Sequence, residues 1–196
     1  GQAKVADLKA NLRGRLIEPK DPAYEEARAL YNGMIDKRPL AIARCVDVAD
    51  VITAVNFGRD NALPVAIRGG GHNIAGYAVC DGGVMIDLST MKEVRVDASA
   101  RRAHVQPGAT LGDVDRATQA YGLATPTGIN STTGIAGLAL GGGFGWLSRK
   151  LGLTSDNLVS ARIVTADGKC LHVHATSHSD LFWALRGGGG NFGVVT

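Results

Sequence analysis

The sequence predicts a fold in which helices and strands are mixed, and its length of 196 residues fits one large domain or two small subdomains. Its first part has a strand–helix–strand rhythm, which is typical of parallel strands joined by a crossover helix. Its middle part alternates apolar and polar residues over short runs, which predicts strands with one exposed face. Near its end the pair Asp167-Gly168 separates two such runs and predicts a β-hairpin.

The first part contains two predicted helices and two predicted strands. Asp21 and Pro22 precede early acidic residues and predict a helix start. Asp47 is expected to cap a second helix over residues 48–59, because four apolar residues recur there at helical spacing, namely Val48, Val51, Ile52 and Val55. The flanking strands, which we expect to pair in parallel, are residues 40–43 and 65–67.

The later elements are shorter. Strands are predicted in the alternating runs at residues 83–88, 93–97 and 102–106, and in the hairpin at residues 158–165 and 170–174. One helix is predicted over residues 111–121 and ends at Gly122, and another over 181–186 is capped by Ser179 and Asp180. The chain stops inside an apolar strand pattern at residues 194–196, so we expect it to be a piece of a longer protein.

Composition narrows the classes of partner. The chain is 45% hydrophobic and 20% charged, ordinary values for a globular protein, but its 27 glycines are about double the average usage. The net charge of +3 comes from scattered basic residues, and aromatic residues are few. This pattern predicts no nucleic-acid partner, and the small positive charge favours an anionic small ligand.

Cysteines and hydropathy give further expectations. Cys45, Cys80 and Cys170 are odd in number and widely spaced, which predicts neither a disulfide framework nor a zinc site. We interpret Cys80 as a small buried thiol. No apolar run reaches the length of about 18 residues that a membrane span requires, and no signal peptide is visible, so a cytoplasmic protein without a membrane partner is expected.

A glycine loop follows the predicted strand at residues 65–67. Three consecutive glycines stand between Arg68 and His72. Glycine permits sharp turns and a close approach to a ligand, and consecutive backbone N–H groups form a concavity that binds anions. The alternative is a plain glycine turn beside a surface histidine.

A second glycine cluster covers residues 134–145 and is nearly uncharged. Backbone of this kind can lie against a large flat group, although close packing of a helix on a strand is the alternative. Gly188, Gly190 and Gly193 match GxGxxG, but they follow a helix and precede a strand, the reverse of a Rossmann site. Gly168-Lys169 lacks the Ser or Thr of a Walker A motif. Two separate glycine loops therefore favour a long ligand with a pyrophosphate and a planar ring.

Four motifs, taken together and in this order, resemble the FAD-linked oxidases of the vanillyl-alcohol oxidase and p-cresol methylhydroxylase (PCMH) superfamily. They are similar to its berberine-bridge-enzyme-like and 6-hydroxynicotine-oxidase-like branch. The resemblance extends from about Arg38 to the end of the chain. The motifs are RGGGHN at residues 68–73, GLALGGGFG at 137–145, DNL at 156–158 with TADG at 165–168, and DLFWALRGGGGNFG at 180–193.

The resemblance implies an α+β, bilobed PCMH-type FAD-binding domain with two small mixed-sheet subdomains, about residues 1–90 and 91–196. A substrate domain carrying the catalytic base would lie beyond this chain. The loop at residues 68–73 would hold the pyrophosphate, and His72 would bond covalently to the flavin 8α-methyl group. Doubly linked members also carry a cysteine where this chain has Asn130, so a single link through His72 is implied.

The same resemblance implies a set of FAD-binding residues. The glycine cluster at 134–145 would follow the ribityl chain and the ring, and Ile163 would border the adenine. The full set is Arg68, Gly69, Gly70, Gly71, His72, Asn73, Gly76, Asn130, Thr133, Gly134, Gly137, Leu138, Gly141, Gly143, Phe144 and Ile163. Thr133 would leave oxygen free access to the flavin.

Two minor features have alternative interpretations. His172, His174 and His178 could bind a metal, but without a cysteine or carboxylate nearby a solvated hairpin face is the preferred interpretation, and no metal site is predicted. Asn130-Ser131-Thr132 matches a glycosylation sequon, which a flavin-facing loop would make inaccessible.

Three functions remain open from the sequence. The preferred one is an oxidoreductase in which a small organic substrate delivers a hydride to FAD and oxygen then takes the electrons. The second is an FAD-binding module without turnover, and the third is a nucleotide-binding domain that holds no flavin.

Overall fold

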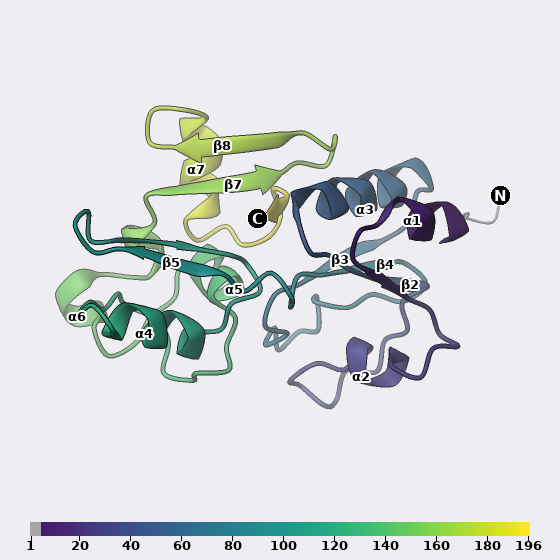
Figure 1. Cartoon of the computed structure of the whole chain (residues 1–196), viewed down its shortest axis with the longest axis horizontal. Coiled ribbons are helices and arrows are strands. Elements are labelled where there is room, and N and C mark those ends of the chain that lie inside the picture. Colours follow the sequence, from purple (N-terminus) through teal and green to yellow (C-terminus); the bar gives the residue numbers. More distant parts are fainter. Residues whose placement is uncertain (1–4) are drawn as a thin grey trace.

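The computed structural model describes residues 5–196 and mixes helices with strands in three sheets (Figure 1). The helices are α1 (Val5–Asn11), α2 (Tyr24–Arg28), α3 (Val48–Asp60), α4 (Leu111–Gln119), α5 (Ile135–Leu140), α6 (Ser148–Leu151) and α7 (Ser179–Leu185), with a 3-10 turn at Ser155–Asn157. The strands are β1 (Arg15–Ile17), β2 (Ala41–Arg44), β3 (Val65–Arg68), β4 (Val84–Asp87), β5 (Val94–Asp97), β6 (Arg102–Val105), β7 (Ser160–Val164), β8 (Cys170–His174) and β9 (Val194–Val195). The predicted α+β content is confirmed.

The first sheet has the strand order β1-β2-β4-β3. We predicted that the two strands flanking α3 pair with each other in parallel, and this is wrong. Both are parallel to β4, which lies between them and pairs Met85 with Ile42 on one side and with Ala66 on the other. The connection through α3 thus passes over one strand position between β2 and β3. The strand β4 occupies that central position, and all four of its residues are buried.

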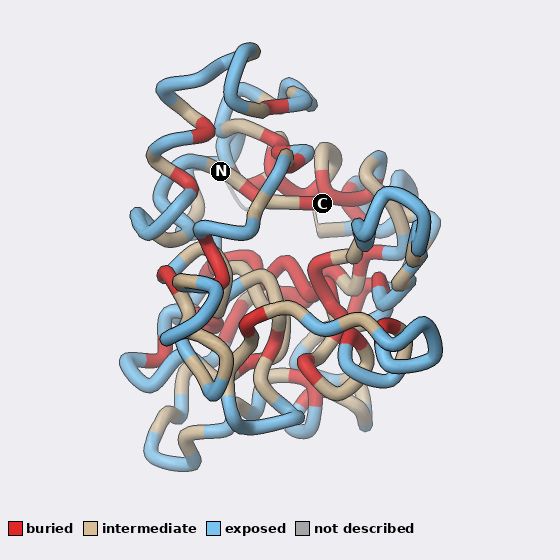
Figure 2. The backbone as a smooth tube through the Cα atoms, turned by 90° about the vertical axis from the view of Figure 1, so that its left-hand side faces the viewer, coloured by how far each residue is buried: buried red, intermediate tan, exposed pale blue. Residues whose placement is uncertain are grey.

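Helices cover both faces of this sheet. Alternate residues of the central strands point to opposite sides, so that Ala43 and Ile86 pack with α1 and α3 while Ile42 and Met85 pack with α2. Burial on both faces explains why β2 and β4 are continuous apolar runs without alternation. Figure 2 shows the resulting contrast between the buried inner backbone, in red, and the exposed outer turns, in pale blue.

A buried carboxylate fixes the start of α3. Asp47 caps the helix as predicted, because its side chain accepts a hydrogen bond from the backbone N–H of Asp50 at 3.0 Å. The Asp50 carboxylate is itself buried and accepts backbone N–H groups from Arg13 at 2.8 Å, Gly14 at 3.0 Å and Val46 at 3.0 Å. These three bonds satisfy the buried charge and tie the segment before β1 to the helix.

The other two sheets come from the second half of the chain. β5 and β6 form an antiparallel pair that lies against α4, and β7 pairs with both β8 and β9 in the order β8-β7-β9. The predicted hairpin is confirmed, and its Gly168 adopts φ +80°, a conformation that the Asp-Gly turn provides. Val164 and Val194 join the core of the first sheet, so the halves share one hydrophobic cluster.

Three local predictions need correction. Asp21 does not cap α2, because Ala23 occupies the cap position. Ser179 and Asp180 lie inside the first turn of α7, which begins after His178 in a left-handed conformation with φ 50°. Part of the segment that we read as a loop is the helix α5, where alanine and leucine, both strong helix formers, make up four of the six residues. The division of the chain near residue 90 stays a prediction.

The described residues also bear on two partner predictions. Between residues 5 and 196 no helix is long and apolar enough to span a membrane. The same part of the chain holds no group of three or more His, Cys, Asp or Glu side chains that could bind a metal ion. His172 and His174 are neighbours on strand β8, with ring centroids 5.4 Å apart.

Candidate functional site

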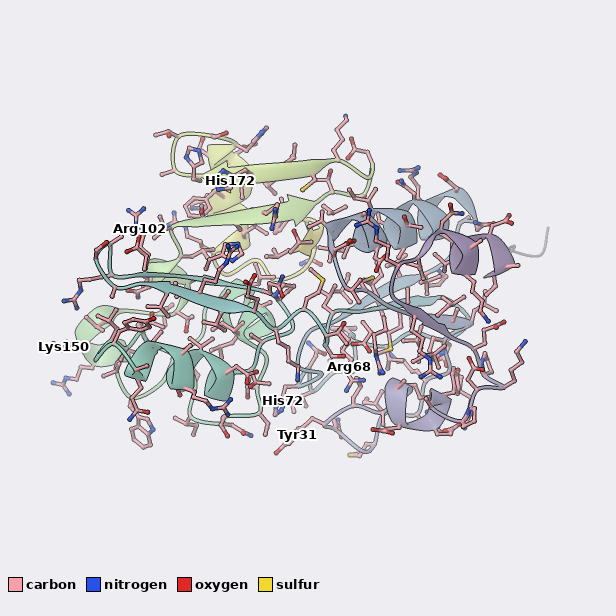
Figure 3. The ribbon with its side chains drawn as sticks, in the orientation of Figure 1. Tyr31, Arg68, His72, Arg102, Lys150 and His172 are labelled. Atoms are coloured by element: carbon pink, nitrogen blue, oxygen red, sulfur yellow. The ribbon has the colours of Figure 1, made fainter. Side chains whose placement is uncertain are left out.

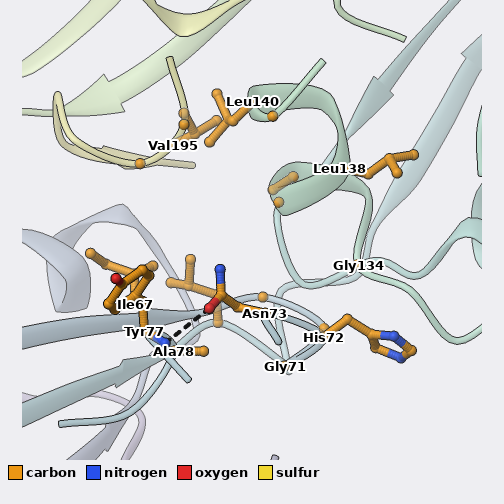
Figure 4. A pocket seen from close by; sticks show the side chains of 18 of the residues that line it. Ile67, Gly71, His72, Asn73, Tyr77, Ala78, Gly134, Leu138, Leu140 and Val195 are labelled. Atoms are coloured by element: carbon orange, nitrogen blue, oxygen red, sulfur yellow. Dashed lines mark hydrogen bonds between the residues drawn. The ribbon is translucent and has the colours of Figure 1, made fainter. Parts of the chain in front are cut away.

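A cavity of about 680 Å³ lies between the end of β3 and the helix α5 (Figure 4). This volume is within the range of small-molecule and cofactor sites. Its lining comes from residues 65–67, 69–73, 77, 78, 88, 133, 134, 136–138, 140, 141, 189–191, 193 and 195. Residues more than 100 positions apart in the sequence therefore share one site.

We call the side formed by residues 69–73 the His72 wall. It begins where β3 ends, so the position of the loop is set by the pairing of β3 with β4. Gly71 has φ +73°, which requires glycine for the chain to turn. Gly70 lies against the backbone of Gly134, because a Cβ atom built on it would stand 2.3 Å from the Gly134 nitrogen. The two glycine clusters predicted from the sequence thus touch each other directly.

His72 is held on three sides. The Tyr31 ring stacks on it with centroids 4.1 Å apart and planes at 16°. The Thr132 hydroxyl lies 3.0 Å from Nε2, and the Thr133 hydroxyl lies 3.4 Å from Nδ1. Burial lowers the pKa of His72 below its ordinary value of 6.5, while a hydrogen bond with the Thr132 backbone acts in the opposite direction. Burial therefore favours the neutral form of the ring, and its neighbours limit its rotation.

The segment that carries Tyr31 is fastened to the same loop. The backbone N–H of Tyr31 donates to the Gly71 carbonyl at 3.1 Å, and the Asn32 side chain donates to the Ile74 carbonyl at 2.9 Å. Arg68 Nη1 donates to the Ala27 carbonyl at 2.6 Å. Figure 3 shows Tyr31, Arg68 and His72 close together below the first sheet. Arg68 thus connects the end of β3, where the loop begins, to α2.

We call the opposite side, formed by α5 and residues 189–193, the glycine wall. A Cβ atom on Gly137, Gly189 or Gly190 would meet no other atom within 4 Å, so these glycines leave open space that a side chain would occupy. Leu140 and Val195 add apolar surface at the upper edge in Figure 4. A flat or extended ligand can approach the backbone closely on such a surface.

The lining residues carry no formal charge when His72 is neutral. Asn73 is a polar side chain of the loop itself, and its Oδ1 accepts the backbone N–H of Tyr77 at 3.0 Å. An anionic group at the His72 wall would therefore be met by the backbone N–H groups of the glycine loop, not by an arginine or a lysine.

The structure separates the predicted site residues into two groups. Those that line the cavity are Gly69, Gly70, Gly71, His72, Asn73, Thr133, Gly134, Gly137, Leu138 and Gly141. Those placed outside the lining are Arg68, Gly76, Asn130, Gly143, Phe144 and Ile163. Ile163 is wholly buried in the β7 core, Phe144 is 77% exposed, and Gly76 packs against Ile35.

Sequence reasoning missed the contribution of the last glycine cluster to the site. Gly189, Gly190, Asn191 and Gly193 line the cavity together with Val195. The run of four glycines at residues 187–190 was a usable signal. Because it does not match a Rossmann fingerprint, we did not predict it as part of the binding site. No local sequence pattern marks Tyr31 or Thr132 as a site residue, because each lies far from His72 in the sequence and contacts it only in the folded chain.

The comparisons with known proteins agree on one class. Residues 39–174 match the family model described as a FAD binding domain. The (R)-6-hydroxynicotine oxidase of Paenarthrobacter nicotinovorans is 40% identical over 186 residues, which make up 95% of this chain and 41% of that protein. The structure of 6-hydroxy-D-nicotine oxidase from Arthrobacter nicotinovorans matches with a TM-score of 0.93 at 40% identity, over 94% of this chain and 41% of that one.

A plant relative extends the comparison. The structure of the berberine-bridge-enzyme-like (BBE-like) protein 1 from Physcomitrella patens matches with a TM-score of 0.91 at 33% identity, over 98% of this chain and 42% of that one. The chain spans about two fifths of the length of the relatives that it matches. It belongs to the FAD-linked oxidases of the vanillyl-alcohol oxidase and PCMH superfamily, in the branch of the 6-hydroxynicotine-oxidase-like and BBE-like proteins.

Proposed function

We propose that this chain is the cofactor-binding part of an FAD-dependent oxidase that oxidises a small organic molecule. The observation that carries the proposal is the cavity between the His72 wall and the glycine wall. One side offers a glycine loop with a neutral histidine, and the other offers backbone with room where side chains would stand. Both features fit an extended cofactor with an anionic centre and a planar ring.

The residues of the cavity would hold FAD by shape and backbone polarity. The loop of Gly69, Gly70 and Gly71 would receive the pyrophosphate through its N–H groups. Gly134 and Gly137 would lie against the ribityl chain and the ring, as the open space beside Gly137 allows. When bound, FAD supplies the two-electron acceptor for hydride transfer, and the protein supplies its position and surroundings.

We further propose one covalent link, between His72 and the flavin 8α carbon. Forming it replaces one C–H bond and one N–H bond by a C–N bond, and the two electrons and two protons released pass to oxygen. A nucleophilic nitrogen needs an unprotonated lone pair, which the lowered pKa of His72 provides at pH 7. Asn130 stands where doubly linked relatives have cysteine, which supports a single link.

The experiment is acid precipitation of full-length protein made with ample riboflavin. Flavin colour should stay with the polypeptide of the wild type and leave it in His72→Ala. A variant with Cys45, Cys80 and Cys170 all replaced by serine is the matched control and should keep its colour. Covalent flavin in His72→Ala would overturn the link, and a wild type that binds no flavin would overturn the proposed function.

Turnover separates this proposal from its alternative, an FAD-binding module without activity. The relatives are named oxidases and oxidoreductases, which favours turnover with oxygen as the acceptor. Thr133 lines the cavity and is half-buried, so a small side chain would leave oxygen a path to the flavin. Flavin reduced with dithionite should reoxidise in air-saturated buffer faster than free reduced flavin, and Thr133→Leu should slow it. Reoxidation no faster than that of free flavin would contradict oxygen as the acceptor.

The arrangement of the whole protein is also a proposal. Two subdomains would flank the cavity, and a substrate domain with the catalytic base would come from sequence outside this chain. Substrates in the class of alcohols, sugars and amines are the panel on which the full-length protein should be assayed.

A further inference from the structure

The hydrogen bonds around His72 define which of its nitrogens carries the proton. Asn130 Oδ1 accepts two hydrogen bonds from Thr132, one from the backbone N–H at 3.1 Å and one from the hydroxyl at 2.9 Å. A backbone N–H can only donate, so the atom of Asn130 that faces it is the oxygen and not the amide nitrogen.

The Thr132 hydroxyl is therefore oriented. Its single hydrogen points to Asn130 Oδ1, because two oxygens 2.9 Å apart without a hydrogen between them would repel each other. The lone pairs of the hydroxyl are then free to face His72 Nε2, which lies 3.0 Å away. A lone pair can only accept, so the hydrogen of this contact belongs to Nε2.

The second nitrogen has a weaker neighbour. Thr133 Oγ1 lies 3.4 Å from Nδ1, at the long end of the hydrogen-bond range. With Nε2 protonated in the neutral ring, Nδ1 carries the lone pair. The stacked Tyr31 ring holds the plane of the imidazole, and a 180° flip within that plane would place Cε1 where Nε2 now faces Thr132 and lose that hydrogen bond.

We infer that Asn130 and Thr132 are positioning residues that fix His72 as the Nε2–H tautomer and so present Nδ1 as its nucleophilic atom. The inference rests on the proposed covalent link for its functional meaning. As Nδ1 forms a bond, positive charge develops on the ring, and an acceptor at Nε2–H stabilises that charge. Asn130 thereby has a role of its own at the position where doubly linked relatives carry cysteine.

The tautomer is measured directly by nitrogen NMR of the imidazole rings. Full-length protein labelled with ¹⁵N-histidine and made in riboflavin-depleted cells leaves His72 unmodified. The His72 signals are identified by their loss in His72→Gln. We expect a protonated Nε2 and an unprotonated Nδ1 in the wild type, and a mixture of tautomers in Thr132→Val, which keeps the shape but removes the hydroxyl.

Covalent attachment gives the second readout. After FAD is added to the same proteins, Thr132→Val should attach flavin about tenfold more slowly, the factor expected when one hydrogen bond to a charged group is lost. Thr132→Ser should restore the rate, and Asn130→Ala should lie between the two. Ser131→Ala, which changes the exposed residue between them, is the matched control and should behave as the wild type.

The possible outcomes separate the two proposals. A wild-type His72 protonated at Nδ1, or a Thr132→Val protein with unchanged tautomer and attachment rate, would overturn the inference. Wild-type protein with the Nε2–H tautomer that binds FAD only reversibly would overturn the covalent link, and the assigned role of Asn130 and Thr132 in setting the tautomer would stand.

Discussion

The two walls of the cavity are built by opposite means. The His72 wall is held in place by contacts with neighbouring parts of the chain. The strand β3 pairs with β4, Arg68 donates to Ala27, and Tyr31 stacks on His72. The glycine wall has few side chains to fix it, and three of its glycines face open space. One wall can therefore hold a reactive group in place, while the other admits a large ligand because several of its positions are glycines that face open space.

This difference determines how each wall responds to substitution. At Gly70 on the His72 wall an added atom meets other backbone, so it should affect the stability of the fold. At Gly137 on the glycine wall an added atom meets nothing within 4 Å, so it should affect the ligand and leave the fold intact.

The largest effect is expected for Gly70→Ala. The new Cβ atom would lie 2.3 Å from the nitrogen and 2.6 Å from the Cα of Gly134, and backbone atoms cannot move aside cheaply. We expect the free energy of unfolding to fall by about 2–3 kcal/mol, measured by urea denaturation. Gly33→Ala is the matched control, since its Cβ meets nothing within 4 Å. Equal stability of the two variants would remove the distinction between the walls.

Gly137→Leu should have the opposite effect to Gly70→Ala: it should weaken the binding of FAD and leave the fold stable. Leucine is a better helix former than glycine, so α5 should be unchanged or more stable by up to about 1 kcal/mol. Its side chain would enter the cavity, and the affinity for FAD should fall by about tenfold or more. Titration of flavin fluorescence in a His72→Ala background, where binding would be reversible, measures this. Unchanged affinity would show that the cofactor does not touch the glycine wall.

The smallest effect concerns the pH dependence of flavin attachment. Burial lowers the pKa of His72, so the neutral ring predominates from a pH below 6.5 upward. The rate of covalent attachment should therefore rise with pH, pass its midpoint below pH 6.5 and be level at neutral pH. Mixing apoprotein with FAD in buffers from about pH 5 to 8 measures the profile.

Tyr31 sharpens this measurement. Tyr31→Phe keeps the stacked ring and should leave the profile unchanged. Tyr31→Ala exposes the imidazole, so the midpoint should move up toward 6.5, and the rate should fall about threefold with the loss of the stacking contact. Identical profiles for Tyr31→Ala and Tyr31→Phe would mean that the stacking does not position His72.

Much of the fold was predictable because its signals are local. The capping of α3 by Asp47, the strand before the glycine loop and the hairpin at Asp167-Gly168 all depend on residues within a few positions of one another. The same holds for the loop with His72, where three glycines and a histidine identify the site by themselves. Segments without such signals, such as α1, β1 and α6, were not predicted.

The sequence by itself therefore determined most of the elements, the two glycine clusters and the family. The tertiary structure alone decided that β4 separates β2 from β3, that Gly70 touches Gly134, and that the glycines at 189–193 complete the cavity. It also brought Tyr31 and Thr132 to His72 from 41 and 60 positions away. The physical reason is that such contacts depend on the path of the whole chain, which no short stretch of residues encodes.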